Sequence, residues 1–281
     1  FQFTNTSTIP TGTLTALWNF GNSNTSSAYS PSETYTKDTG YTVQLISVSN
    51  RGCRDTTTRT LTVFPKPFPA FSINDTNQCI NTNQYQFTNQ STIKYGTNTY
   101  KWFFGDGDSL AGTNASHHYT TDADYTVTLK ATSNNGCIDS TKSNIILYPK
   151  PQADFAVNDT DQCLNTNSFV FTGLSTVKSG NLRYIWTFGG GFTSTQKDTT
   201  IVYIGQANYN VRLIARSDFD CYDTTTAIAY VYPVPVPDFS VNDTDQCLQE
   251  NNFTFTNQSA INGGTMTYGW TFGSVPCVAK K

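Results

Sequence analysis

The residues best suited to chemistry in this sequence are the acidic and amide side chains of a short loop that occurs three times. The loop reads Asn-Asp-Thr-Asn at 74–77 and Asn-Asp-Thr-Asp at 158–161 and 242–245. Carboxylate and amide oxygens are the ligands that Ca²⁺ prefers. The alternative is structural, because Asn and Asp also hold turns by bonding their own backbone. Both interpretations stay open, and the candidate calcium ligands are Asp75, Asp159, Asp161, Asp243 and Asp245.

The cysteines are the second group with a chemical role. Cys79, Cys163 and Cys247 are 84 residues apart, and Cys53, Cys137 and Cys221 form another series with the same step. Regular cysteines in a chain with one Met and no metal-ligand clustering indicate structural disulfides, which form outside the cytoplasm. The sequence therefore indicates an extracellular protein.

Two pairings are conceivable for Cys79, with Cys53 or with Cys137. Cys53 begins a final strand of roughly ten residues, about 33 Å at ~3.3 Å per residue, which carries the chain away from it. A disulfide needs Cα atoms about 4.4–6.8 Å apart, so the second pairing is favoured. We predict the disulfides Cys79–Cys137 and Cys163–Cys221, with the partners of Cys53 and Cys247 outside this fragment.

The 84-residue step also relates other residues, which indicates an internal repeat. It relates all four tryptophans, Trp18, Trp102, Trp186 and Trp270. Pro-x-Pro sequences at 65–67, 149–151 and 233–235 mark the boundaries, because they favour extended, stiff connectors. The expected domains are repeat 1 (1–66), which lacks its first strand, the complete repeats 2 (67–150) and 3 (151–234), and repeat 4 (235–281), an N-terminal part with an atypical tail at 274–281.

Composition excludes several classes of protein. Only 13% of the residues are charged, the net charge is −3, and no basic cluster exists, so the electrostatic footprint of a nucleic-acid-binding protein is missing. No apolar run approaches the ~18 residues that cross a bilayer. We expect no nucleic-acid partner and no membrane span in this segment.

Within a repeat, large apolar and small polar residues alternate, as at 85–88, 100–104 and 125–131. Period two is the signature of half-buried strands, and the glycine-containing segments 105–108 and 134–136 supply turns between them. About seven short strands per repeat favour an all-β, Ig-like antiparallel sandwich. The four tryptophans keep one strand position, so we expect them to be core anchors rather than sugar-stacking platforms.

One succession of motifs recurs in the repeats. In repeat 2 it runs from Phe87–Ser91 through Trp-Phe-Phe-Gly-Asp-Gly at 102–107 and His-His-Tyr at 117–119 to Tyr-Thr-Val-Thr-Leu at 125–129. This succession resembles the PKD domain, which is marked by W-x-F-G-D-G and a later G-x-Y-x-V-x-L strand. The resemblance implies tandem Ig-like (PKD-type) antiparallel β-sandwiches in an extended rod. Gly-Asp-Gly occurs only in repeat 2, so no repeated function can depend on Asp106.

The resemblance also bears on candidate sites. Some PKD domains bind calcium near their ends, which supports calcium as the one candidate cofactor. Asp-Ser/Thr-x sequences after the second cysteine of each repeat resemble bacterial O-glycosylation sites, and their hydroxyl residues are Thr56, Ser140 and Thr224. Thr-rich strand faces without sugar are the alternative. His117 and His118 lie in a strand motif and occur in one repeat only, and no known catalytic motif is present, so we expect no catalytic residue and no enzyme.

Two functions from different classes remain. The paired cysteines and Asn-Asp-Thr loops look most like repeats of large secreted adhesins from gliding bacteria with type IX secretion. That resemblance implies a structural or adhesive stalk or filament at the cell surface. Its partners would be neighbouring repeats, glycans or other cells, and incomplete end repeats could complete one another between chains by strand addition. The alternative is a carbohydrate-binding accessory array of a secreted hydrolase, which recurrent exposed aromatic platforms would favour.

Overall fold

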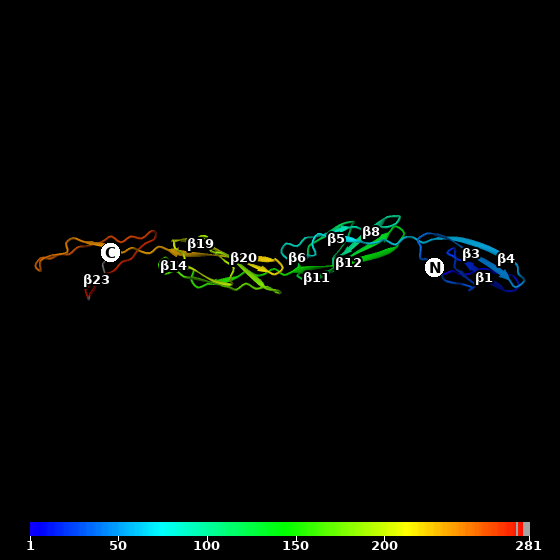
Figure 1. Cartoon of the computed structure of the whole chain (residues 1–281), viewed down its shortest axis with the longest axis horizontal. Coiled ribbons are helices and arrows are strands. Elements are labelled where there is room, and N and C mark those ends of the chain that lie inside the picture. Colours follow the sequence, from blue (N-terminus) through cyan, green and yellow to red (C-terminus); the bar gives the residue numbers. More distant parts are fainter. Residues whose placement is uncertain (274, 278–281) are drawn as a thin grey trace. The chain divides into compact units, whose positions relative to one another are not determined.

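The computed structural model of the chain describes residues 1–273 and 275–277, and it consists of strands joined by turns and loops (Figure 1). The described part divides into two compact units, each of which is considered by itself. Unit 1 comprises residues 1–78 and 83–147, and unit 2 comprises residues 79–82 and 148–281. Residues 274 and 278–281 of the predicted atypical tail lie outside the described residues.

Repeat 3, which lies within unit 2, shows the complete architecture. A three-stranded sheet has the order β13-β15-β18, and a five-stranded sheet has the order β14-β20-β19-β16-β17. The bounds of the first sheet are β13 Phe155–Val157, β15 Phe169–Gly173 and β18 Asp198–Ile201. Those of the second are β14 Asp161–Cys163, β16 Leu182–Thr187, β17 Thr193–Ser194, β19 Ala207–Ser217 and β20 Tyr222–Tyr232. The prediction of an all-β, Ig-like sandwich is confirmed, although β14 pairs with β20 in parallel rather than antiparallel.

Repeat 2 has the same two sheets. The first has the order β10-β7-β5 and the second the order β6-β12-β11-β8-β9. Their bounds are β5 Phe71–Ile73, β6 Asn77–Cys79, β7 Tyr85–Asn89, β8 Asn98–Phe103, β9 Ser109–Ala111, β10 Ala115–His117, β11 Asp124–Ser133 and β12 Ile138–Tyr148. Each strand keeps the position that its counterpart 84 residues later has in repeat 3.

Repeats 1 and 4 carry fewer strands in the described residues. Repeat 1 has one four-stranded sheet of order β2-β1-β3-β4, with bounds β1 Leu14–Asn19, β2 Thr25–Ser26, β3 Gly40–Ser49 and β4 Arg54–Thr62. Repeat 4 has two pairs, β21 Phe239–Val241 with β22 Phe255–Asn257, and β23 Trp270–Phe272 with β24 Val275–Cys277. Where a complete repeat has its three-stranded sheet, repeat 1 has only an isolated bridge between Gln2 and Ser32.

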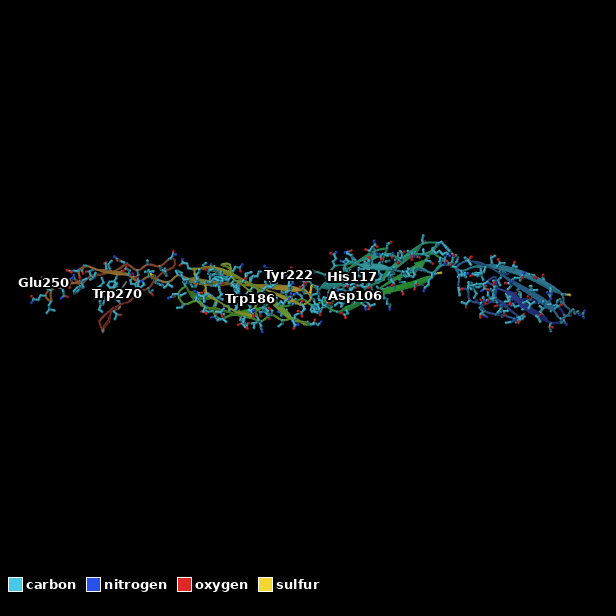
Figure 2. The ribbon with its side chains drawn as sticks, in the orientation of Figure 1. Asp106, His117, Trp186, Tyr222, Glu250 and Trp270 are labelled. Carbon is cyan, nitrogen blue, oxygen red and sulfur yellow. A yellow bond between two sulfur atoms is a disulfide. The ribbon has the colours of Figure 1, made fainter. Side chains whose placement is uncertain are left out.

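The cores form because large apolar residues alternate with polar ones along each strand and face inward. In repeat 3, inward-facing residues of both sheets form one cluster around Trp186, which is fully buried. Figure 2 labels Trp186 among the side chains of the chain. The Trp186 indole N–H donates to the carbonyl of Gln196 at 2.9 Å, so its one polar group is satisfied. Trp102 is equally buried and Trp18 nearly so, whereas Trp270 is only half-buried. The structure thus places three tryptophans in cores, and none of these three offers a sugar platform.

A buried asparagine that the sequence analysis did not single out ties the opening segment of repeat 3 to its core. Asn167 is 5% exposed. Its side chain donates to the carbonyl of Tyr203 at 2.9 Å and accepts from the Tyr203 backbone N–H at 2.7 Å. The side chain replaces the strand partner that this part of the backbone lacks. Asn83 makes the same two bonds with Tyr119 in repeat 2, so the period of 84 is the signal that could have found this residue.

We expect Asn167→Ala to destabilise repeat 3 by about 2–4 kcal/mol, because two buried backbone groups of Tyr203 lose their partner. Amide hydrogen exchange of β19 and β20 in the full chain measures this loss. Asn165→Ala is the matched control, since Asn165 is exposed in the same segment. Equal protection in the two variants would show that the Asn167 bonds do not stabilise the repeat.

Candidate functional site

The most distinctive chemical feature of unit 2 is a disulfide between Cys79 and Cys221, with Cα atoms 5.5 Å apart. Cys79 ends β6 of repeat 2, and Cys221 comes just before β20 of repeat 3. The two cysteines are 142 residues apart in sequence. The bond therefore links consecutive repeats instead of closing a loop within one.

The predicted pairs Cys79–Cys137 and Cys163–Cys221 are wrong. In repeat 3, Cys163 is in register with Tyr232 at the end of β20, whereas Cys221 precedes the beginning of β20. The 11 residues of β20 span about 36 Å at ~3.3 Å per residue, far beyond the reach of a disulfide. The strand length that argued against a Cys53–Cys79 disulfide thus also separates Cys163 from Cys221. The free cysteines in the described residues are Cys53, Cys137, Cys163 and Cys247.

Aromatic and ionic contacts surround the disulfide in unit 2. The ring of Tyr148, the last residue of β12, stacks on that of Phe219 with centroids 3.9 Å apart. The ammonium group of Lys150 lies 2.7 Å from the carboxylate of Asp223. Burial alone would raise the pKa of Asp223, but the bonds from Lys150 and from the Ala153 N–H outweigh it and lower the pKa. These contacts fix the linker after repeat 2 against the turn that carries Cys221.

Unit 1 has related contacts one period earlier. Lys66 of the first linker lies 3.0 Å from the carboxylate of Asp139 and holds the pKa of Asp139 below its ordinary value. The thiol of Cys137 lies 4.0 Å from the carbonyl oxygen of Phe64, the counterpart of Tyr148. The linker lysines were not predicted as contact residues, although their recurrence at 66 and 150 is a detectable signal.

The structure assigns turn-forming bonds to the acidic loops. Asp75, Asp159 and Asp243 each accept a hydrogen bond from the backbone N–H two residues later, at 2.9–3.1 Å. Asp161 accepts from the hydroxyls of Thr160 and Tyr232, and Asp245 accepts from that of Thr244. None of these five carboxylates belongs to a group of three or more metal-ligating side chains in the described part of the chain. The Asx-turn interpretation accounts for the loops.

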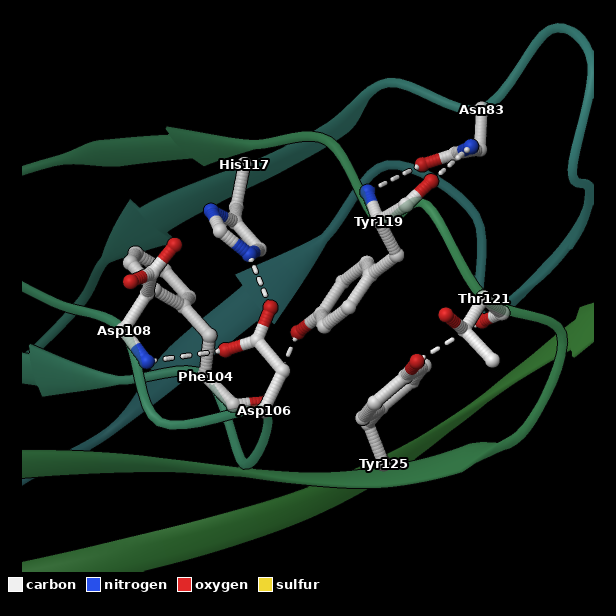
Figure 3. A network of polar contacts seen from close by, with 8 residues as sticks. All are labelled: Asn83, Phe104, Asp106, Asp108, His117, Tyr119, Thr121 and Tyr125. Carbon is white, nitrogen blue, oxygen red and sulfur yellow. Dashed lines mark hydrogen bonds and ion pairs between the residues drawn. The ribbon is translucent and has the colours of Figure 1, made fainter.

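Three metal-ligating side chains do meet elsewhere, at Asp106, Asp108 and His117. Figure 3 shows the Asp106 carboxylate between the His117 ring and the backbone N–H of Asp108. Its Oδ2 lies 2.6 Å from Nε2 of His117, and its Oδ1 accepts from the Asp108 N–H at 3.1 Å. The His117 ring also stacks on Phe104 at 4.1 Å. The contact between Asp106 and His117 holds the Gly-Asp-Gly loop against β10.

Repeat 1 has a comparable polar contact at this position with different chemistry, and repeat 3 has an apolar side chain there. In repeat 1, Glu33 replaces His117, and the carboxylate of Glu33 accepts from the side-chain amides of Asn22 and Asn24 at 3.0 and 2.8 Å. In repeat 3 the counterpart of His117 is the buried Ile201. Since the position in the fold persists while metal-ligating groups do not, a structural role explains Asp106 and His117.

The contact between Asp106 and His117 affects the pKa of the Asp106 carboxyl group. Burial alone would raise the pKa of Asp106, but the bonds from His117 and the Asp108 N–H together lower it. A carboxyl group with a lowered folded-state pKa contributes stability that is present above its unfolded value of about 3.9 and lost as pH falls through the folded-state pKa. We expect His117→Phe to raise the pKa of Asp106, as measured by carboxyl ¹³C NMR titration. An unchanged titration curve would show that His117 does not stabilise the ionised carboxylate.

The three candidate O-glycosylation residues, Thr56, Ser140 and Thr224, are all exposed. Asp139, which precedes Ser140, pairs with Lys66, and Asp223, which precedes Thr224, pairs with Lys150. The Asp-Ser/Thr-x pattern thus has a packing role whether or not sugar is attached.

The comparisons with known proteins agree with the repeat pattern. A family model described as PKD domain matches residues 1–64, 66–146 and 148–231. The PKD1 domain of Vibrio anguillarum Epp is similar at 25% identity, covering 29% of this chain and 93% of that chain, with a TM-score of 0.26. The PKD1 domain of the Vibrio cholerae metalloprotease PrtV is similar at 22% identity, covering 30% and 98%, with a TM-score of 0.25. No curated protein matches significantly in sequence. In the described residues, no helix is long and apolar enough to cross a membrane.

Proposed function

Because the chain belongs to the PKD-domain family, we propose that it is a structural segment of an extracellular stalk or filament in which a disulfide links consecutive repeats. The finer proposal is a giant repetitive adhesin at a bacterial cell surface, of the type IX secretion kind. Neighbouring repeats are its first partners, and surface glycans or other cells are the partners of the whole protein.

The observation that carries this proposal is the Cys79–Cys221 disulfide. A disulfide inside one domain stabilises that domain alone, whereas a bond between consecutive repeats gives tension a second covalent route besides the backbone, from Cys79 directly to Cys221. The residues between the two cysteines cannot be extended while the bond is intact. Disulfides persist in oxidising surroundings, which supports an extracellular location.

The distribution of exposed aromatic residues favours the stalk over a carbohydrate-binding array. In repeat 2 the exposed aromatics are Phe68, Tyr95 and Phe103, and in repeat 3 they are Phe192, Phe219, Tyr222 and Tyr232. No position is shared between these two sets when they are compared at the 84-residue step. An array of sugar-binding repeats would need an exposed aromatic ring at the same position in each repeat. Repeats 2 and 3 share no such position.

Surface labelling of the source cells tests the proposed location and role. Antibodies raised against this chain are expected to label intact cells, and mild protease treatment of intact cells is expected to remove the label. Intact-mass measurement of the released protein also tests the proposed glycans, since an unmodified mass would exclude sugar on Thr56, Ser140 and Thr224. Labelling only after lysis would contradict the proposal.

A further inference from the structure

A groove lies along one edge of the five-stranded sheet of repeat 3, within unit 2. β16 pairs with β17 only at Trp186 and Thr187, so residues 182–185 have no strand partner on that side in the described structure. The cavity beside this segment has a volume of about 520 Å³. Its lining includes Tyr184, Thr195 and three cationic residues, Arg183, Lys197 and Arg216. The groove therefore combines an open strand edge with positive charge.

Two of these cations lie opposite each other in the sheet. Arg183 of β16 and Arg216 of β19 are direct cross-strand partners, and like charges at such positions repel. The carboxylate of Asp220 joins them. Its Oδ1 lies 3.0 Å from a terminal guanidinium nitrogen of Arg183 and 3.1 Å from Nε of Arg216. Since each guanidinium group has five N–H donors, both keep donors for a second anion.

The residue that joins the arginines has an unusual backbone conformation. The φ angle of Asp220 is +63°, a left-handed conformation that is unfavourable for most residues other than glycine. Its counterparts in repeats 1 and 2 are Gly52 and Gly136, with φ angles of +83° and +80°. Repeat 3 thus has a carboxylate in a turn position where the other two repeats have glycine, and this carboxylate holds two side chains of the groove.

The positive charge of the groove is specific to repeat 3. The counterparts of Arg183, Lys197 and Arg216 in repeat 2 are the uncharged Thr99, Thr113 and Thr132. Repeat 2 forms the same five-stranded sheet with these threonines, so the fold does not require cations there. The chain as a whole has a net charge of −3. A local excess of positive charge in such a chain is complementary to a ligand that carries negative charge.

The ring of Tyr184 forms an apolar part of the groove. A Cβ atom on Gly173 of β15 would lie 2.6 Å from a ring carbon of Tyr184 and 2.8 Å from the carbonyl oxygen of Lys197, so the ring lies directly against the backbone of Gly173. Repeat 2 has Asn89 at this position. Tyr184 is half-buried. The groove of repeat 3 therefore offers a fixed aromatic ring beside its cations.

We propose that this groove binds a carboxylate group of an acidic polysaccharide, a polymer of uronic acid. Arg183 and Arg216 donate to the carboxylate, because the planar guanidinium group matches its two oxygens. Lys197 adds a third positive charge, and the sugar ring lies against Tyr184. Charged side chains on an edge strand oppose the addition of another strand, so the groove favours a saccharide over an extended acidic peptide.

The inference rests on the proposed function, because it names the class of glycan that the extracellular segment meets. It differs from a carbohydrate-binding array, since it concerns one repeat and depends on charge rather than on recurrent aromatic rings. The two proposals fail separately. Labelling of source cells only after lysis would overturn the location without changing the binding measurements, whereas absence of binding would overturn this site without changing the labelling.

Calorimetric titration of the full chain with polygalacturonate tests the site, at low ionic strength because salt screens exposed charges. The fully methyl-esterified polymer is the matched ligand control, since it has the same sugar without the charge. We expect at least tenfold weaker binding of the ester. A flat titration with polygalacturonate, or equal binding of the two polymers, would overturn the proposal. Equal binding of polyglutamate would overturn the choice of a saccharide.

Two arginine variants distinguish a site from general attraction. Arg216→Thr introduces the residue of repeat 2 and is expected to weaken binding about tenfold, the usual effect of losing a charge-assisted hydrogen bond. Arg212→Thr removes the same charge from the same strand, also introduces the repeat 2 residue, and lies outside the lining of the groove. We expect it to change binding less than twofold. Equal losses in the two variants would overturn the proposal.

Amide hydrogen exchange locates the bound polymer and checks the fold of the variants. Polygalacturonate is expected to protect residues 182–185 and 195–197 in the unaltered chain and not in Arg216→Thr. Protection of β20 without polymer is expected to be the same in both chains, which shows that repeat 3 is folded in the variant. Protection by the polymer in other parts of the chain only would contradict the site.

Discussion

Reduction of the Cys79–Cys221 disulfide is expected to lengthen the fully stretched chain by about 500 Å. The bond spans 142 residues, and each residue adds roughly 3.5 Å when the chain is extended. While the bond is intact, tension passes from Cys79 directly to Cys221, so most of repeats 2 and 3 cannot contribute to the length. Single-molecule force spectroscopy with handles at the two ends, with and without a reductant, measures the difference.

Two variants serve as controls for the force experiment. Cys221→Ser is expected to show the long extension without reductant, because Cys79 has lost its partner. Cys163→Ser is expected to behave like the unaltered chain, because Cys163 is free. The same maximum length before and after reduction would contradict a covalent link between consecutive repeats.

Trp186→Ala is expected to destabilise repeat 3 by about 3–5 kcal/mol, the usual cost of removing a large buried ring. Trp186 is 0% exposed and contacts the rings of Phe155 and Phe188 at 5.1 and 5.4 Å. Deletion of its indole leaves a cavity between the two sheets and orphans the Gln196 carbonyl. Hydrogen exchange of β16 and β19 in the full chain reports on the repeat that is affected.

The matched variants for this core prediction are Trp186→Phe and Trp270→Ala. Trp186→Phe keeps an aromatic ring in the core and loses the indole bond and only part of the buried ring volume, so a smaller loss is expected. Trp270 is half-buried, and its replacement is expected to cost less than that of Trp186. Similar losses for Trp186→Ala and Trp270→Ala would show that burial at this strand position does not decide the stability of the repeat.

Local patterns in the sequence predicted the fold well. The alternation at 125–131 predicted a half-buried strand, and β11 contains these residues with Val127, Leu129 and Ala131 buried. The common spacing of the tryptophans predicted one core position, which Trp102 and Trp186 occupy. These features depend on neighbours in the same repeat, so a pattern of one repeat length suffices to find them.

The disulfide could not be found in this way, because it depends on contacts between consecutive repeats. The stacking of Tyr148 on Phe219 brings the end of one repeat to the turn of the next, and neither residue has a distinctive motif. The signal was nevertheless present. A strand of about 36 Å separates the two cysteines of one repeat, so Cys79 should have been tested against the counterpart of Cys137 in the next repeat, which is Cys221.

The candidate calcium loops show a chemical pattern for which the structure gives a structural cause. Asp159 accepts the backbone N–H of Asp161, and Asp161 accepts the hydroxyl of Tyr232. Recurrence of acidic residues in repeats 2, 3 and 4 is equally expected of a metal site and of a turn. Only side-chain positions separate the two, because a metal site requires oxygens that converge whereas a turn requires one oxygen near one backbone N–H.

Peptide mapping of the unreduced chain by mass spectrometry tests the covalent link between repeats most directly. Digestion without reductant, with free thiols blocked beforehand, is expected to yield one linked pair of peptides that contains Cys79 and Cys221, with Cys137 and Cys163 blocked as free thiols. Linked peptides that join Cys79 to Cys137 and Cys163 to Cys221 would contradict it and would restore two separate repeats, each closed by its own disulfide.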